Sequence, residues 1–236
     1  MVCALKVKPW YQGDHAAIAG IREEVEEAYP DLAWLPDADP PRFRGPFRIV
    51  EDGEVFAEYS LEVALPGDTP RGIPEVFEVA GTIPRNADRH VNANGSLCVV
   101  LPDAYWLHCP TGLSLVEFLK GPLRAHLAGQ ALAAMGKPWP VGEWAHGDDG
   151  IAEFYSRELQ VTERGQLAMV LGLALKPRPP RQRVCPCGSG EKLRRCHGQH
   201  VDRLRARVPA HLLERAVAGL LSGMQGRKTV SPEALS

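Results

Sequence analysis

Apolar residues recur along the chain in two different periods, one typical of helices and one typical of strands. Between residues 14 and 29 they are spaced by three and four, as expected for one face of an amphipathic helix. These positions are Ile18, Ile21, Val25 and Ala28. Asp14 stands where a helix needs an N-cap, and Pro30 follows the last apolar position, so we predict a helix over 14–29.

From Phe47 onward, apolar and polar residues nearly alternate, which is the pattern of half-buried strands. The alternating apolar positions are Phe47, Ile49, Val55, Tyr59, Leu61, Val63 and Leu65, with a turn marked by Gly53. A proline- and glycine-rich turn over 66–74 leads to a further strand around Val76 to Val79. With a helix before the strands and helices after them, the chain is predicted to be α+β with a four-stranded antiparallel meander.

The second half of the sequence predicts helices and one linker. A helix over Leu113 to Leu132 is expected to bend near Gly121-Pro122, and another covers Ile151 to Leu159. The segment 176–183 is rich in proline and arginine and has no apolar period, so it is predicted to be an extended linker. We therefore expect a large domain over 1–175, the linker 176–183, a small module over 184–200, a C-terminal helix over 201–225 and a disordered tail over 226–236.

Composition narrows the class of protein. The chain has 236 residues, 44% of them hydrophobic and 24% charged, and no apolar run approaches the roughly 20 residues that cross a bilayer. The N-terminus lacks the apolar stretch and cleavage site of a secretory signal, so we expect a cytoplasmic protein without a membrane partner. A formal net charge of -2 gives no global attraction to nucleic acid, although residues 176–207 are basic.

Four potential metal ligands lie close together near the C-terminus, namely Cys185, Cys187, Cys196 and His197. Three thiols and an imidazole suit a closed tetrahedral zinc site, which would be structural because no position is left for a catalytic water. Gly188 and Gly190 would let the backbone turn between the ligand pairs. The alternative is a cysteine-rich basic loop without metal.

The stretch Cys-Pro-Cys-Gly-Ser-Gly-x-Lys followed by Cys-His resembles the SEC-C motif, known from the tail of the bacterial preprotein translocase motor. Basic residues lie between the two ligand pairs: Lys192, Arg194 and Arg195. They could form a basic protrusion that binds an acidic partner, or they could simply face solvent.

Cys98 is the candidate nucleophile. A cysteine thiolate can attack an activated carbonyl, and the resulting thioester can pass its acyl group to a lysine amine. Asn94-Gly95 supplies a tight turn that would hold Cys98 at the edge of the sheet. The alternative is that Cys98, flanked by Leu97 and Val99, is a small buried hydrophobe in a strand. Cys3 and Cys109 have no such setting, and we interpret both as structural or incidental.

Several motifs in order along the chain resemble ubiquitin-conjugating enzymes. The stretch over 65–77 is similar to the proline-rich turn and strand of that family, and residues 94–98, Asn-Gly-Ser-Leu-Cys, are similar to its active-site segment. Trp106 and Pro110 follow the cysteine as a tryptophan and a proline do in the family. The resemblance covers roughly residues 14–160 and implies that Cys98 carries a protein C-terminus as a thioester.

The sequence also departs from the family pattern. The family usually carries histidine-proline-asparagine further upstream of the cysteine, whereas here His90-Val91-Asn92 lacks the proline and lies closer to Cys98. Either Asn92 or His90 could support the transition state or the loop, and a histidine here could instead be exposed loop filler. Asn94 is interpreted as a turn former. The first helix is acidic at Glu23 to Glu27, where the family's helix is generally basic.

A conjugating-enzyme-like domain joined to a SEC-C module resembles prokaryotic proteins of antiphage operons with cyclic-oligonucleotide signalling (CBASS). The resemblance implies that the C-terminus of a cyclic-nucleotide synthase, or a ubiquitin-like protein, is transferred through Cys98 to an acceptor lysine. Two other readings stay open: a non-catalytic binding module for such a C-terminus, and an adaptor that acts through the SEC-C module.

Overall fold

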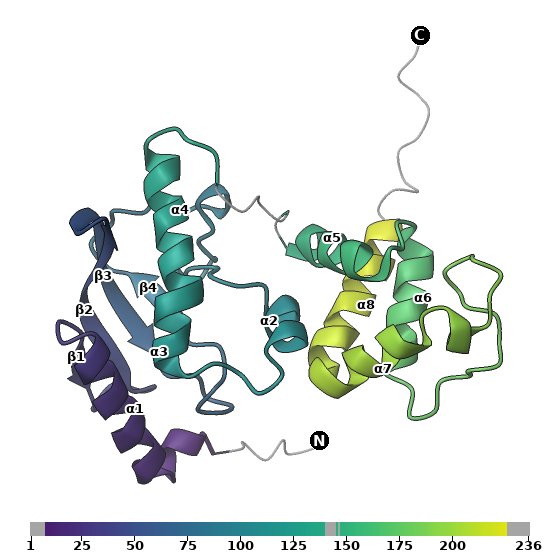
Figure 1. Cartoon of the computed structure of the whole chain (residues 1–236), viewed down its shortest axis with the longest axis horizontal. Coiled ribbons are helices and arrows are strands. Elements are labelled where there is room, and N and C mark those ends of the chain that lie inside the picture. The colour runs from purple at the N-terminus through teal and green to yellow at the C-terminus, as the bar shows by residue number, and fades with distance from the viewer. Residues whose placement is uncertain (1–7, 140–144, 146, 226–236) are drawn as a thin grey trace. The chain divides into compact units, whose positions relative to one another are not determined.

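The computed structural model describes residues 8–139, 145 and 147–225. The chain divides into two compact units (Figure 1). Unit 1 comprises residues 1–100 and 111–142, and unit 2 comprises residues 101–110 and 143–236. The predicted tail 226–236 and Cys3 lie outside the described residues.

Unit 1 contains an antiparallel sheet of four strands in the order β1-β2-β3-β4. The strands are β1 (Ala33–Leu35), β2 (Arg42–Glu51), β3 (Glu54–Ala64) and β4 (Glu75–Glu78). The four-stranded antiparallel meander is therefore confirmed. Strand β1 and the first residues of β2 were not located by the alternating pattern, which began at Phe47.

The β2–β3 hairpin turns through two residues, Asp52 and Gly53, both with positive φ (51° and 85°). This geometry matches the right-handed twist of the strands and explains why a glycine stands there. Phe43 lies opposite Val63 and Phe47 opposite Tyr59, with all four side chains buried. The other face carries opposite charges across the strands, including Arg48 and Glu58, which fix the register together with the apolar face.

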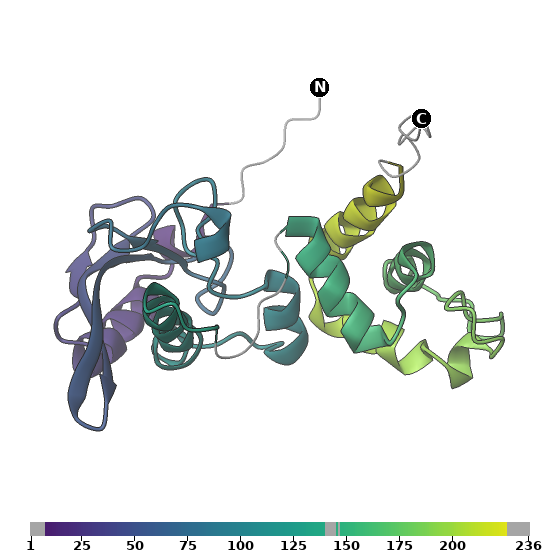
Figure 2. The ribbon, with the colours of Figure 1, turned by 90° about the horizontal axis from the view of Figure 1, so that it is seen from above.

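The helical elements of unit 1 are a short η1 (Trp10–Gln12), α1 (His15–Ala28), η2 (Ala87–Arg89), α3 (Leu115–Phe118), the π-helical η3 (Leu119–Leu123) and α4 (Arg124–Ala134). Helices α1 and α4 lie on one face of the sheet (Figure 2). Tyr29, at the end of α1, stacks on Phe47 with 5.2 Å between ring centroids. The Tyr59 hydroxyl donates to the Leu127 carbonyl of α4 at 3.2 Å.

Two predicted helix features of unit 1 are confirmed. The Asp14 side chain accepts a hydrogen bond from the Ala17 backbone N–H at 2.9 Å, as an N-cap does. The long second helix is interrupted where Gly121-Pro122 predicted a bend, since Pro122 has no N–H to continue the regular pattern and a π-helical turn forms instead.

Unit 2 is helical and has one continuous apolar core. Its elements are α2 (Pro102–His108), α5 (Gly147–Leu159), α6 (Arg164–Ala174), η4 (Leu193–Arg195), α7 (Gly198–Arg207) and α8 (Ala210–Gln225). The expected boundary at 176–183 differs from the structure, which places α5 and α6 with the C-terminal helices because their apolar faces form the same core. Trp106 belongs to α2 and hence to this unit.

The single C-terminal helix predicted over 201–225 is two helices in the structure. Val208 is extended (φ -94°, ψ 127°) between α7 and α8, as the residue before a proline prefers. Helix α6 was not predicted, because its own apolar residues occupy most of its circumference and leave no clear amphipathic stripe.

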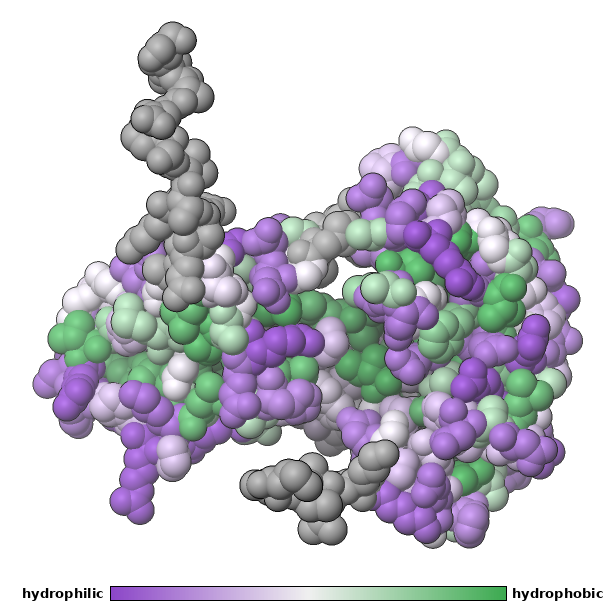
Figure 3. Space-filling model, turned by 180° about the vertical axis from the view of Figure 1, so that it is seen from behind, coloured by the Kyte–Doolittle hydropathy of each residue, from purple (hydrophilic) through white to green (hydrophobic). Residues whose placement is uncertain are grey.

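The face seen in Figure 3 carries hydrophilic residues interspersed with exposed apolar ones. The large hydrophobic side chains exposed among the described residues include Val50, Val55, Phe56, Met135, Met169, Val184 and Leu221. No helix within the described part of the chain is both long and apolar enough to span a membrane.

Candidate functional site

The predicted metal ligands are carried by a small backbone hairpin. The Cys185 N–H donates to the Glu191 carbonyl at 2.7 Å, and the Leu193 N–H donates to the Arg183 carbonyl at 2.9 Å. Gly188 (φ 85°) and Gly190 (φ 76°) form the turn between them. Residues other than glycine rarely adopt these backbone angles, so both glycines are needed for the turn that the sequence suggested.

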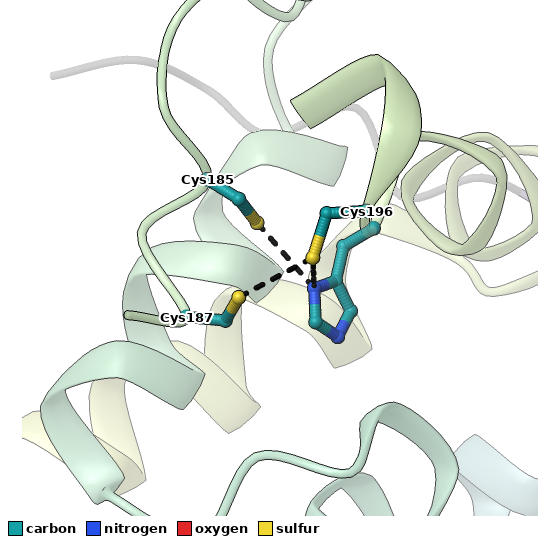
Figure 4. A group of neighbouring side chains, drawn as sticks. Cys185, Cys187 and Cys196 are labelled. Atoms are coloured by element: carbon teal, nitrogen blue, oxygen red, sulfur yellow. Dashed lines mark hydrogen bonds between the residues drawn. The ribbon is translucent and has the colours of Figure 1, made fainter. Parts of the chain in front are cut away.

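The structure brings all four predicted ligands together (Figure 4): their donor atoms lie within 4.8 Å of one another. Cys185 Sγ is 3.4 Å and Cys196 Sγ 3.1 Å from His197 Nδ1, and Cys187 Sγ is 3.4 Å from Cys196 Sγ. In a tetrahedral zinc–thiolate site, sulfur atoms bonded at about 2.3 Å lie about 3.8 Å apart. The cluster therefore has the dimensions of a single four-coordinate metal site.

The orientation of His197 favours metal binding. Its Nε2 lies 2.7 Å from the carbonyl oxygen of Leu159, at the end of α5. A carbonyl only accepts hydrogen bonds, so Nε2 carries the proton and the Nδ1 lone pair of the neutral ring faces the three sulfurs. Such a hydrogen bond on the outer nitrogen is the usual way in which proteins orient a histidine ligand.

The thiols of the cluster differ in acidity. Burial raises the pKa of Cys185 to about 11. Desolvation acts on Cys187 in the same direction, but hydrogen bonds from Ser189 and from the neighbouring thiols outweigh it and lower its pKa to about 6. Cys185 would thus stay protonated at neutral pH without a cation, whereas a bound metal ion would stabilise it as a thiolate.

The hairpin packs into the core of unit 2 and is not a separate module at the end of an extended linker. Cys185 and Leu193 are buried and belong to the same core as α5, α6 and α7. In addition, Arg181 forms an ion pair with Asp202 of α7. The segment 176–183 is irregular, as predicted, but it connects parts of one folded unit.

The second candidate site is the loop over residues 90–98 in unit 1. Val91 and Leu97 pair across it as in an antiparallel ladder, with hydrogen bonds from the Asn92 N–H to the Ser96 carbonyl (2.8 Å) and from the Cys98 N–H to the His90 carbonyl (2.7 Å). The Leu97 N–H also donates to the Val76 carbonyl of β4 at 2.7 Å. The loop is thereby attached to the end strand of the sheet.

Asparagine side chains stabilise the tip of this loop. Asn92 Nδ2 donates to Ser96 Oγ at 3.0 Å, and Ser96 Oγ donates to Asn94 Oδ1 at 2.8 Å. Gly95 has a φ of 87°, in the left-handed region. Asn94 is thus a turn former, as the sequence suggested, and the Asn92 amide is engaged within the turn.

His90 has a positive φ of 50° and contributes its carbonyl to the Cys98 N–H. Its ring packs near Trp139, with 4.8 Å between centroids, and near His126 of α4, at 6.1 Å. Burial lowers the pKa of His126 to about 3, so that ring is neutral. His90 is therefore part of an aromatic cluster and is not exposed loop filler.

Sequence reasoning missed the contact that fixes this loop to α4. Arg89 Nε donates to Gln130 Oε1 at 2.9 Å, and a second Arg89 nitrogen donates to the Gln130 carbonyl at 2.9 Å. In return, Gln130 Nε2 donates to the Arg89 carbonyl at 2.6 Å. The two residues are 41 positions apart, and no local pattern in the sequence signals such a pair.

The Cys98 thiol is exposed, so the alternative of a buried core cysteine is not what the structure shows. Among the described residues, no ion pair or side-chain hydrogen bond stabilises its thiolate, and partial desolvation raises its pKa above the ordinary value of 9.0. Cys109 is partly buried at the end of α2, in unit 2.

We expect alkylation of Cys98 by iodoacetamide to accelerate about tenfold per pH unit from pH 7 to 9, because only the thiolate reacts and its fraction rises with pH below the pKa. Peptide mass spectrometry of the alkylated cysteine gives the rate. A rate that levels off below pH 8 would show that a neighbouring group lowers this pKa.

The comparisons with known proteins agree with the metal cluster. Residues 184–199 match the SEC-C motif, a span that contains all four ligands. No curated protein and no solved structure matches the chain. The Cys3His donor set is suited to a metal ion and is consistent with zinc. The chain thus carries a SEC-C motif with a potential metal-binding Cys3His cluster.

Proposed function

We propose that this chain is a conjugating enzyme of the ubiquitin type, which carries the C-terminus of another protein as a thioester on Cys98. The observation that carries the proposal is the exposed Cys98 thiol at the end of a loop that backbone hydrogen bonds attach to β4. The order of helix, four-stranded meander, cysteine loop and long helix in unit 1 is the order that the resemblance implies.

The chemistry requires an activated acyl donor. The Cys98 thiolate attacks the donor's carbonyl, a carbon–sulfur bond forms, and the activating group leaves with the electron pair. A lysine amine of the acceptor then attacks the thioester, the carbon–nitrogen bond forms, the sulfur leaves as thiolate, and the amine proton passes to water. An exposed thiol suits this role, since the acyl donor and the acceptor are both macromolecules that must reach the sulfur.

In this proposal, Asn92 and His90 act by positioning the sulfur. Asn92 shapes the turn through Ser96, and the His90 carbonyl holds the Cys98 N–H. The Arg89–Gln130 hydrogen bonds support the same segment from α4. A polar side chain that stabilises the oxyanion would come from this loop or from the partner protein.

We further propose that the metal is zinc and that its role is structural, since all four donors come from the chain. The donor protein is proposed to be a cyclic-nucleotide synthase or a ubiquitin-like protein of an antiphage operon, with a lysine of a target protein as acceptor, in the cytoplasm.

The test is to express the chain with its neighbouring genes and to compare nonreducing with reducing gels. The wild-type chain is expected to show a band shifted by the mass of a second protein, which thiol removes, and Cys98→Ala should abolish it. Cys109→Ala is the matched control and should keep the band. If the partner co-purifies equally with Cys98→Ala and no thiol-sensitive band ever forms, the chain is a non-catalytic binding module.

A second candidate function, an adaptor acting through its metal-binding module, is favoured by the SEC-C match. Deleting residues 177–236 would not test it cleanly, because α7 and α8 share the core of α5 and α6. Substitutions of exposed residues on the module leave this core intact and therefore test the adaptor function more directly.

A further inference from the structure

A groove of about 370 Å³ lies in unit 2 between α6 and the metal-binding hairpin. Its size is at the lower end of the range in which proteins bind small ligands or single anchoring side chains. The residues that line it are Met169, Gly172, Leu173, Lys176, Pro180, Arg183, Val184, Pro186 and Leu193.

The groove has an apolar lining that stays open to solvent. Leu173 and Leu193 are buried residues, whereas Met169 is 54% and Val184 64% exposed. These two large apolar side chains would be removed from water together if a partner's side chain covered the groove, which would favour binding. Methionine is also a side chain that adapts its shape to different partners.

Two positively charged side chains lie beside the apolar lining of the groove. Lys176 and Arg183 line the groove and are exposed, and neither forms an ion pair with any described residue. Seven basic residues and only one acidic residue, Glu191, lie between positions 176 and 195. One of these cations, Arg181, forms an ion pair with Asp202 of α7. Since Glu191 is the one acidic residue of the segment, the segment as a whole keeps a strong positive charge.

We propose that this groove binds a short acidic peptide segment of a partner protein, which inserts one bulky apolar side chain between Met169 and Val184. Carboxylates on either side of that anchor would pair with Lys176 and Arg183. A single nucleic acid strand fits the groove less well, since no aromatic side chain lines it for base stacking. The proposal does not depend on the chemistry of Cys98.

One wall of the groove is the metal-binding hairpin. Val184 and Pro186 flank the ligand Cys185, and Leu193 lies between the two ligand pairs. The backbone hydrogen bonds at Cys185 and Leu193 hold this wall in place. One wall of the peptide site and the metal cluster are therefore parts of the same hairpin, while α6 supplies the other wall.

Selection from a random twelve-residue peptide library displayed on phage, with the full chain as bait, tests the proposal. The expected consensus is one large apolar residue flanked by Asp or Glu. Met169→Glu and Val184→Glu should each weaken binding of the enriched peptide at least about tenfold by fluorescence polarisation, since a buried anchor contributes more than 1.4 kcal/mol. Both positions are exposed, so neither substitution removes core packing.

Matched controls separate the groove from general charge attraction. Leu221→Glu changes an apolar residue of unit 2 that is 47% exposed and lies outside the groove, and it should leave binding unchanged. The pair Lys176→Glu and Arg183→Glu should weaken binding more than the pair Arg194→Glu and Arg195→Glu, which lies outside the lining.

Three outcomes would overturn the proposal. They are the absence of an enriched consensus, a consensus without acidic residues, and equal losses for the groove and control variants. Displacement of the bound peptide by single-stranded DNA or by anionic lipid vesicles, at equal strength in wild type and Met169→Glu, would assign the basic segment to those ligands instead.

Discussion

Removal of a metal ion from the Cys3His cluster is expected to unfold the hairpin over 183–198. The apparent binding free energy of structural zinc in small modules is roughly 10–16 kcal/mol, and most of it is folding free energy. With a chelator, or in Cys185→Ser, the backbone amides at positions 185 and 193 should lose their protection. We expect hydrogen exchange there to rise more than about a hundredfold, as measured by mass spectrometry.

Native mass spectrometry of the untreated chain should show one metal ion per molecule, lost in Cys185→Ser and kept in Cys109→Ser. Alkylation of Cys98 should keep its rate after chelation, because that loop is held by hydrogen bonds within unit 1. If the two amides stay protected without metal, burial of Cys185 and Leu193 is sufficient to fold the hairpin, and the structural role of the ion is wrong.

Asp103→Ala is expected to destabilise unit 2 by about 3 kcal/mol, the loss typical when one partner of a buried charged network is removed. Asp103 is fully buried in α2. It accepts hydrogen bonds from the Tyr155 hydroxyl of α5 and from Arg215 of α8, each at 2.9 Å. Urea unfolding followed by circular dichroism measures the change, and Asp103→Asn should lose less because the amide still accepts from Tyr155.

The sign of the pH dependence follows from the acidity of Asp103. Burial raises its pKa above 3.8, and the hydrogen bond from Tyr155 and the charge of Arg215 offset only part of that effect. The folded state therefore holds this proton more tightly than the unfolded state, so the contribution of Asp103 to stability falls as pH rises through its folded pKa. Asp103→Asn should lack this pH-dependent component, and an identical pH profile for both proteins would contradict this reading.

Local patterns were sufficient to predict much of unit 1. The spacing around Ile18 and Val25 located α1, and Gly53 located the hairpin turn. The alternation from Phe47 identified two strands, but β1 has only three residues, too few for a period to be seen. The domain boundary was misplaced because proline and arginine at 176–183 suggest a linker, while membership of a core depends on contacts distant in sequence.

The two sites differ in how far the sequence could specify them. The four metal ligands lie within thirteen residues, and their residue types and spacing were enough to predict that they share one site. Around Cys98, the turn formed by Asn94 and Gly95 could be predicted, whereas the Arg89–Gln130 contact and the packing of His90 on Trp139 could not. Such pairings arise from tertiary packing, which no local spacing encodes.

The most direct test of the proposed chemistry replaces the sulfur of Cys98 with oxygen. Cys98→Ser, expressed with the neighbouring genes and analysed by tandem mass spectrometry after proteolysis, should yield a peptide over residues 90–100 whose serine is esterified by the C-terminal residue of a second protein. An unmodified serine in this variant, together with an unmodified Cys98 in the wild type isolated under acidic, thiol-free conditions, would contradict the role of Cys98 as an acyl carrier.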